Sequence, residues 1–107
     1  MLTSQERMDI ANTILQQLGG RKFQAMTGAR QFVALESGLR FKLPGGGGFC
    51  KHGINCVSIT LDPSDTYTVV FYRNRGMTVT TVSEHHDIYF DQLQELFTAE
   101  TGLDTHL

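Results

Sequence analysis

The sequence predicts a single α+β domain, in which a helix at each end of the chain flanks an antiparallel sheet of roughly six strands. Apolar residues recur every three or four positions near both ends, whereas the period falls to two in between. The connections between the central runs are too short for the crossover that parallel strands need, so the sheet is expected to be a meander. The chain has 107 residues, 40% of them hydrophobic, and residues 1–107 are therefore expected to fill one core.

The N-terminal helix is expected to begin at a capping box formed by Thr3 and Glu6, whose side chains can each bond a backbone amide at the helix start. An apolar stripe follows at the helical period. The stripe comprises Met8, Ala11, Leu15 and Leu18, with Ile10 and Ile14 beside it. Gly19 and Gly20 are expected to end the helix, because glycine tolerates the left-handed conformation of a helix stop.

Six short runs rich in β-branched and aromatic residues predict the strands. The runs are KFQAMT, QFVALE, LRFKL, INCVSITL, TYTVVFYR and MTVTTV. Turn-forming residues separate them. In LRFKL the alternation sends Arg40 and Lys42 to the face opposite the apolar side chains.

The C-terminal helix is expected to pack on the sheet through an apolar face. That face comprises Ile88, Tyr89, Leu93, Leu96 and Phe97. Asp87 is the predicted N-cap and Gly102 the predicted stop.

The stretch LPGGGGFCKHGINC, Leu43 to Cys56, is predicted to contain a flexible glycine-rich loop over residues 44–53. A phosphate-binding loop would need a helix directly after the glycines, but a strand follows here. Cys50, His52 and Cys56 have spacings outside the paired pattern of zinc ligands. We therefore expect no metal, no cofactor and ordinary thiols, with Cys56 as a small buried side chain.

The string Glu84-His85-His86-Asp87 has the residue types of acid–base catalysis. Adjacent residues point in different directions, however, so these side chains need not converge on one substrate. The sequence contains no nucleophile motif, zinc-protease helix motif or dinucleotide fingerprint. We therefore expect a protein that is not an enzyme, with no catalytic residues.

Charge is unevenly distributed along the chain. Residues 20–51 contain six basic residues and one acid, whereas residues 76–107 contain six acids and no Lys or Arg. The basic segment supports a nucleic-acid hypothesis, since sheet-based binders combine basic residues with exposed aromatic rings. Its candidate contacts are Arg40, Lys42, Arg73 and Arg75. A pI of about 6.0 and the absence of an RNP-type motif weigh against this hypothesis.

No apolar run approaches the roughly 18 residues that span a bilayer. The N-terminal segment also lacks the apolar block and cleavage site of a signal peptide. We therefore expect an intracellular protein without a membrane partner.

Three segments together resemble a family of small uncharacterised proteins encoded by bacteriophages and related mobile elements. They are TILQQLGGRKFQAMTGARQFVALESGLRFKLP, GINCVSITL and YFDQLQELFTAETGLDTHL, and the most recognisable parts are LGGRKFQAMTGA and ETGLDTHL. The glycine-rich GGGGFC departs from the family pattern. The resemblance implies no activity and no catalytic residues; it implies an accessory protein in the cytoplasm of a bacterial host.

In that context the leading hypothesis is a non-enzymatic accessory protein that binds a host protein, for example as a defence-system inhibitor. Its candidate contacts are Asp91, Glu95 and Glu100 on the last helix. Complementary charge would raise the association rate with such a partner. The alternative is the nucleic-acid-binding module described above. An edge strand could also pair two copies into a homodimer.

Overall fold

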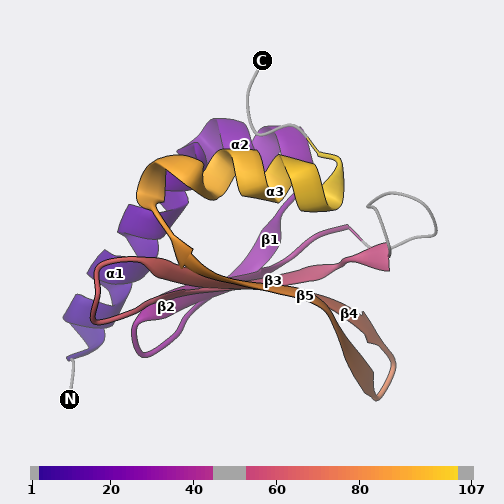
Figure 1. Cartoon of the computed structure of the whole chain (residues 1–107), viewed down its shortest axis with the longest axis horizontal. Helices are drawn as coiled ribbons and strands as arrows, with labels where there is room; N and C mark the ends of the chain where they lie inside the picture. The colour runs from indigo at the N-terminus through magenta and orange to yellow at the C-terminus, as the bar shows by residue number, and fades with distance from the viewer. Residues whose placement is uncertain (1–2, 45–52, 104–107) are drawn as a thin grey trace.

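The computed structural model describes residues 3–44 and 53–103, and it places three helices on one face of an antiparallel sheet (Figure 1). The elements follow one another as α1 (Ser4–Leu18), α2 (Gly20–Thr27), β1 (Arg30–Ala34), β2 (Gly38–Lys42), β3 (Cys56–Leu61), β4 (Tyr67–Arg75), β5 (Thr78–Ile88), the 3₁₀ turn η2 (Phe90–Gln92) and α3 (Leu93–Thr101). The predicted α+β class, the antiparallel sheet and the two terminal helices are confirmed. None of the described helices lies on the opposite face of the sheet.

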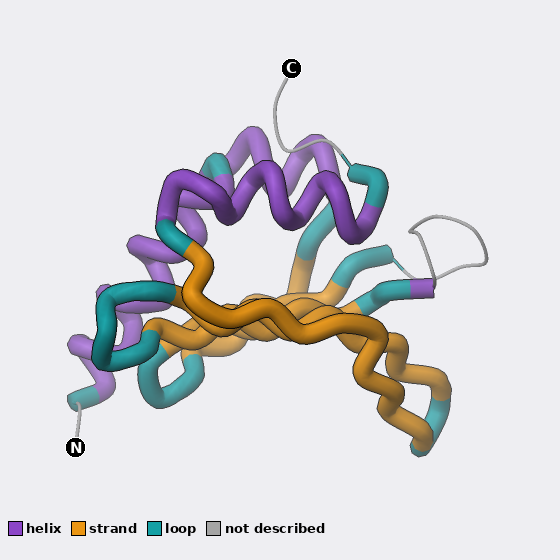
Figure 2. Tube along the Cα trace, in the orientation of Figure 1, coloured by secondary structure: helices purple, strands orange, loops and turns teal. Residues whose placement is uncertain are grey.

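The five strands lie side by side in chain order, β1-β2-β3-β4-β5, so that β1 and β5 are the two edges (Figure 2). Every neighbouring pair is antiparallel. The register of β4 with β5 shifts twice, which adds extra residues to β5 and bends the pair. The far end of this hairpin extends beyond the other strands and curves away from the helices.

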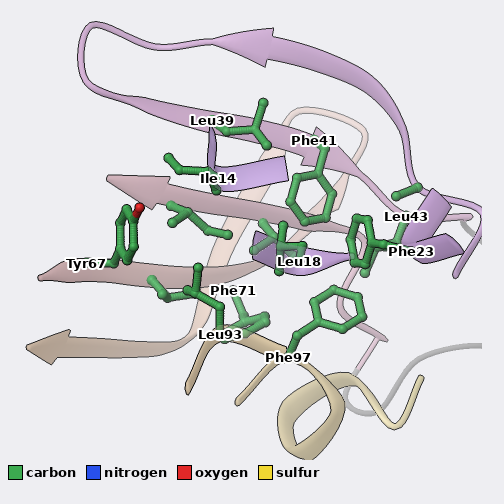
Figure 3. Close-up of a cluster of buried hydrophobic side chains, with 14 of the residues drawn as sticks. Ile14, Leu18, Phe23, Leu39, Phe41, Leu43, Tyr67, Phe71, Leu93 and Phe97 are labelled. Carbon is green, nitrogen blue, oxygen red and sulfur yellow. The ribbon is translucent and has the colours of Figure 1, made fainter. Parts of the chain in front are cut away.

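The core lies between the helix layer and the sheet (Figure 3). Its centre is a group of aromatic rings in which Phe23 of α2 meets Phe41 of β2 and Phe97 of α3 edge-on, with centroid distances of 5.4 and 5.1 Å. Tyr67 of β4 is also buried, and its hydroxyl donates a 2.7 Å hydrogen bond to Oε1 of Gln17 on α1. The pKa of Tyr67 is raised by burial, and the bond to Gln17 opposes this only in part.

The predicted capping box is present at the start of α1. The backbone amide of Glu6 donates to Oγ1 of Thr3, and the amide of Thr3 donates to Oε1 of Glu6, both at 3.1 Å. Gly19 ends α1 with a φ of 126°, as predicted. Within the described residues, none of the three helices combines the length and the apolar character needed to cross a membrane.

The run KFQAMT forms helix α2, so its prediction as a strand was wrong and the sheet has five strands. Gly20, Phe23 and Thr27 are buried at intervals of three and four residues, which is the spacing of one helix face. Thr27 fits because its hydroxyl bonds the carbonyl of Phe23 at 2.7 Å. Gly28 stops the helix in the left-handed conformation, with a φ of 73°.

The start of the last helix also differs from the prediction. Asp87 and Ile88 belong to β5, and α3 begins at Leu93, so Asp87 is not its N-cap. Asp87 has a φ of 57° and lies where the register of β5 shifts against β4, at a bulge that favours this conformation. Tyr89 was expected on the buried face but is exposed. Gly102 ends the helix as predicted, with a φ of 80°.

Candidate functional site

The face of the sheet that carries no helix presents a group of cations. Side chains alternate along β2, so that Phe41 enters the core while Arg40 and Lys42 are exposed on the open face. Arg30 of β1 lies directly opposite Lys42 and is also exposed. Arg30, Arg40 and Lys42 are called the basic patch below. We find no acid among the residues that line the two depressions beside it.

The basic patch borders two shallow depressions. The larger has a volume of about 430 Å³ and the smaller about 170 Å³. The larger is lined by Leu35, Arg40, Lys42, Cys56, Ser58, Tyr72, Asn74 and Val79. The smaller adds Arg30 and Asn55 and shares Lys42, Cys56 and Asn74. The half-buried ring of Tyr72 thus faces the same space as the cations, together with hydroxyl and amide groups.

A pair of hydrogen bonds fixes the strand end that carries Tyr72. The side chain of Asn55 donates from Nδ2 to the carbonyl of Asn74, and its Oδ1 accepts from the amide of Asn74, both at 2.8 Å. The amide of Asn55 also bonds the carbonyl of Tyr72 at 3.0 Å. The backbone from Tyr72 to Asn74, beneath the larger depression, is therefore held by Asn55.

The structure separates the four cations that the nucleic-acid hypothesis grouped. Arg73 and Arg75 alternate with Tyr72 and Asn74 and so point to the other side of β4. A Cβ placed on Gly53 would lie 3.1 Å from Cδ of Arg73 and 3.3 Å from a terminal nitrogen of Arg75. Only Arg40 and Lys42 of the predicted four line the depression, and Arg30 joins them. Arg30 could have been found from the sequence only by knowing the register of β1 with β2.

Cys56 lies on the floor of both depressions and is 9% exposed. Burial raises the pKa of its thiol, and the nearby charges of Arg40 and Lys42 oppose this only in part. The neutral thiol is therefore the favoured form, as expected for a small buried side chain. Cys50 and His52 lie outside the described residues, so the absence of a metal site there stays a prediction.

We expect Cys56 to react with a thiol reagent such as Ellman's reagent at least about tenfold more slowly in the folded protein than in urea, at about pH 8. The reason is that its thiol is both buried and kept protonated. The measurement uses a Cys50→Ser variant, so that Cys56 is the one thiol followed. Equal rates in the two states would contradict the burial of Cys56.

The two adjacent histidines point to opposite faces of the sheet. On the helix side, Nε2 of His85 lies 2.9 Å from Oε1 of Glu100 on α3, and the same oxygen accepts a hydrogen bond from Ser83. The ring of His85 also meets Phe71 edge-on. On the open side, Nε2 of His86 lies 2.6 Å from Oε2 of Glu84. The string that has catalytic residue types therefore does not converge on one place.

The groups around His86 are a hydroxyl and two carboxylates. Oγ1 of Thr68 lies 3.2 Å from Nδ1 of His86 and donates to Oδ2 of Asp62 at 2.7 Å. The one hydrogen of this hydroxyl therefore points to Asp62 and not to His86. The network ties β5 to β4.

The acidic residues proposed for protein binding are divided as well. Asp91 of η2 and Glu95 in the first turn of α3 are exposed, whereas Glu100 is half-buried against Ser83 and His85. Two aromatic side chains next to Asp91 complete a surface that the sequence did not predict. Tyr89 is 59% exposed and Phe90 60% exposed.

Comparisons with protein-family models, with curated proteins and with solved structures find no significant match to this chain. The resemblance to mobile-element proteins therefore stays a prediction from the sequence.

Proposed function

We propose that the protein is a non-enzymatic binding module that holds single-stranded nucleic acid on the open face of its sheet. One observation carries the proposal: the basic patch lies beside an aromatic ring on a face that none of the helices in the described part of the chain covers. Binders of this kind combine cations for the phosphates with flat rings on which bases stack. The proposal adopts the alternative of the sequence analysis and replaces Arg73 and Arg75 with Arg30.

The cations are suitably placed for a phosphate backbone. Arg40 and Lys42 are two residues apart on one strand, a spacing of roughly 7 Å. Arg30 stands opposite Lys42 and extends the positive charge across to β1. An extended single strand can therefore place successive phosphates along the basic patch. Attraction to phosphate supplies most of the affinity in such complexes and weakens steeply with salt.

The larger depression suits a base. Its volume of about 430 Å³ is at the lower end of the range for small-molecule sites. Tyr72 supplies a ring for stacking, while Ser58 and Asn74 supply groups that can hydrogen-bond a base edge. An unstacked base can enter such a space, whereas a base inside a duplex cannot. The geometry therefore favours single strands.

The test is fluorescence anisotropy with labelled oligo(dT) and oligo(U) of about 20 nucleotides and with a duplex of equal length, between about 50 and 200 mM salt. We expect the double variant R40E/K42E to weaken single-strand binding at least about 30-fold and to flatten the salt dependence. R21E/K22E is the matched control, because it makes the same charge change at exposed positions of α2 in the helix layer.

Tyr72→Ala should weaken binding roughly tenfold without changing the salt slope, because stacking does not release counterions. Absence of binding at about 50 mM salt would overturn the proposal. Equal losses in R40E/K42E and R21E/K22E would also overturn it, since the attraction would then be a property of net charge and not of this face.

A further inference from the structure

We propose that a second surface, at the junction of β5 and α3, docks a protein segment in which Lys or Arg alternates with apolar side chains. The surface consists of Tyr89, Phe90, Asp91 and Glu95 and is called the aromatic–acidic corner. It lies where the chain rises from the sheet into the helix layer (Figure 2). This site is separate from the basic patch and does not depend on it.

The two rings are held outside the core by the residues around them. Ile88 packs against the core on one side, and Leu93 is 2% exposed on the other. Between them, Oε1 of Gln92 accepts from the amide of Tyr89 and the amide of Gln92 bonds the carbonyl of Tyr89, both at 2.9 Å. Ile88 and Leu93 are anchored in the core, and hydrogen bonds between Tyr89 and Gln92 hold the turn between them. The backbone at Tyr89 and Phe90 is therefore fixed before a partner binds.

Exposed aromatic side chains on an anchored turn are typical of a surface that contacts another protein. An aromatic side chain usually buries most of its area, and tyrosine is among the residues that contribute most energy to protein interfaces. Tyr89 and Phe90 are each more than half exposed and adjacent in the chain. A rigid ring also loses little conformational entropy when a partner covers it, which lowers the cost of binding.

The charge around the rings defines the partner. Asp91 of η2 and Glu95 in the first turn of α3 are both exposed, and among the described residues neither forms an ion pair. The segment from residue 76 to residue 107 contains no Lys or Arg to neutralise them. The negative electrostatic potential of these two carboxylates repels phosphate and attracts ammonium and guanidinium groups. A protein segment that is both basic and apolar satisfies the two features together.

The probe is a fluorescent peptide of about 12 residues in which Arg and Leu alternate, titrated by anisotropy and by backbone-amide NMR shifts. We expect a Kd of roughly tens of micromolar and the largest shifts over residues 88–95. Peptides with Glu in place of Arg, or Ser in place of Leu, should bind at least about tenfold more weakly. Y89A/F90A should weaken binding at least about tenfold, and D91N/E95Q at least about fivefold.

The matched control is D9N/E36Q, which removes the same charge from exposed positions on α1 and in the β1–β2 turn and should change the Kd less than about twofold. Circular dichroism and the thermal midpoint should be unchanged in every variant, because all six side chains are exposed. Three results would overturn the proposal: absence of peptide binding, shifts centred elsewhere, or equal losses in the control. Concentration-dependent dimerisation that Y89A/F90A abolishes would also overturn it, by identifying a second copy as the occupant.

Discussion

Replacement of Phe23 by alanine is expected to lower the free energy of unfolding by about 3–5 kcal/mol. The side chain is fully buried, and its ring meets Phe41 and Phe97 edge-on, so that it joins α2, β2 and α3. Alanine would leave a cavity where three elements meet, and none of them can close it without moving against the other two. Urea denaturation followed by circular dichroism measures the change.

Lys22→Ala, at an exposed position of the same helix, is the control and should change stability by no more than about 0.5 kcal/mol. A domain of this size has only about 5–15 kcal/mol of stability, so the Phe23 variant should be close to unfolding at physiological temperature. A loss below about 1.5 kcal/mol would show that the ring cluster does not hold the layers together.

Gly38→Ala should destabilise the sheet by about 3 kcal/mol or more. A Cβ at this position would lie 2.1 Å from the carbonyl oxygen of Ile59 and 2.9 Å from Cα of Thr60. Both obstacles belong to the backbone of β3, so no change of side-chain rotamer relieves the overlap. Gly38 pairs with Thr60 in the register of β2 and β3, and this pair must open. Thermal unfolding should show a midpoint lower by at least about 12 °C.

Gly76→Asn is the comparison for that experiment. Gly76, at the tip of the β4–β5 hairpin, has a φ of 61°, and a Cβ there would meet nothing within 4 Å. Asparagine tolerates the left-handed conformation better than other side chains, so we expect a midpoint within about 4 °C of the parent protein. If the two variants unfolded at similar temperatures, close packing against β3 would not be the reason for glycine at position 38.

The elements that the sequence predicted correctly are those whose signals are local. The capping box at Thr3 needs only its own side chains, and five of the six apolar runs pair as strands. The prediction of KFQAMT as a strand failed because a six-residue run fits either period, and the choice depends on contacts that Phe23 makes with β2 and α3. The prediction of Asp87 as an N-cap failed because aspartate is a common helix cap, whereas the pairing of β5 with β4 keeps this residue in the sheet.

The contrast between local signals and contacts across elements also applies to the candidate sites. Alternation within β2 was enough to place Arg40 and Lys42 on the outer face, because that pattern is carried by the strand itself. Arg30 joins them only through the register of two strands, which the sequence does not specify. The exposure of Tyr89 and Phe90 depends on where Ile88 and Leu93 enter the core. Sites assembled across elements are therefore the part that sequence patterns miss.

The neighbour-to-neighbour order of the strands has a consequence for how the chain reaches its native state. Neighbouring strands are separated by at most 13 residues, those between β2 and β3, so the entropy lost in closing each loop is modest. Topologies of this kind have few distant pairings and tend to fold rapidly for their size. The sheet can therefore grow hairpin by hairpin, with each new strand pairing to the strand before it in the chain.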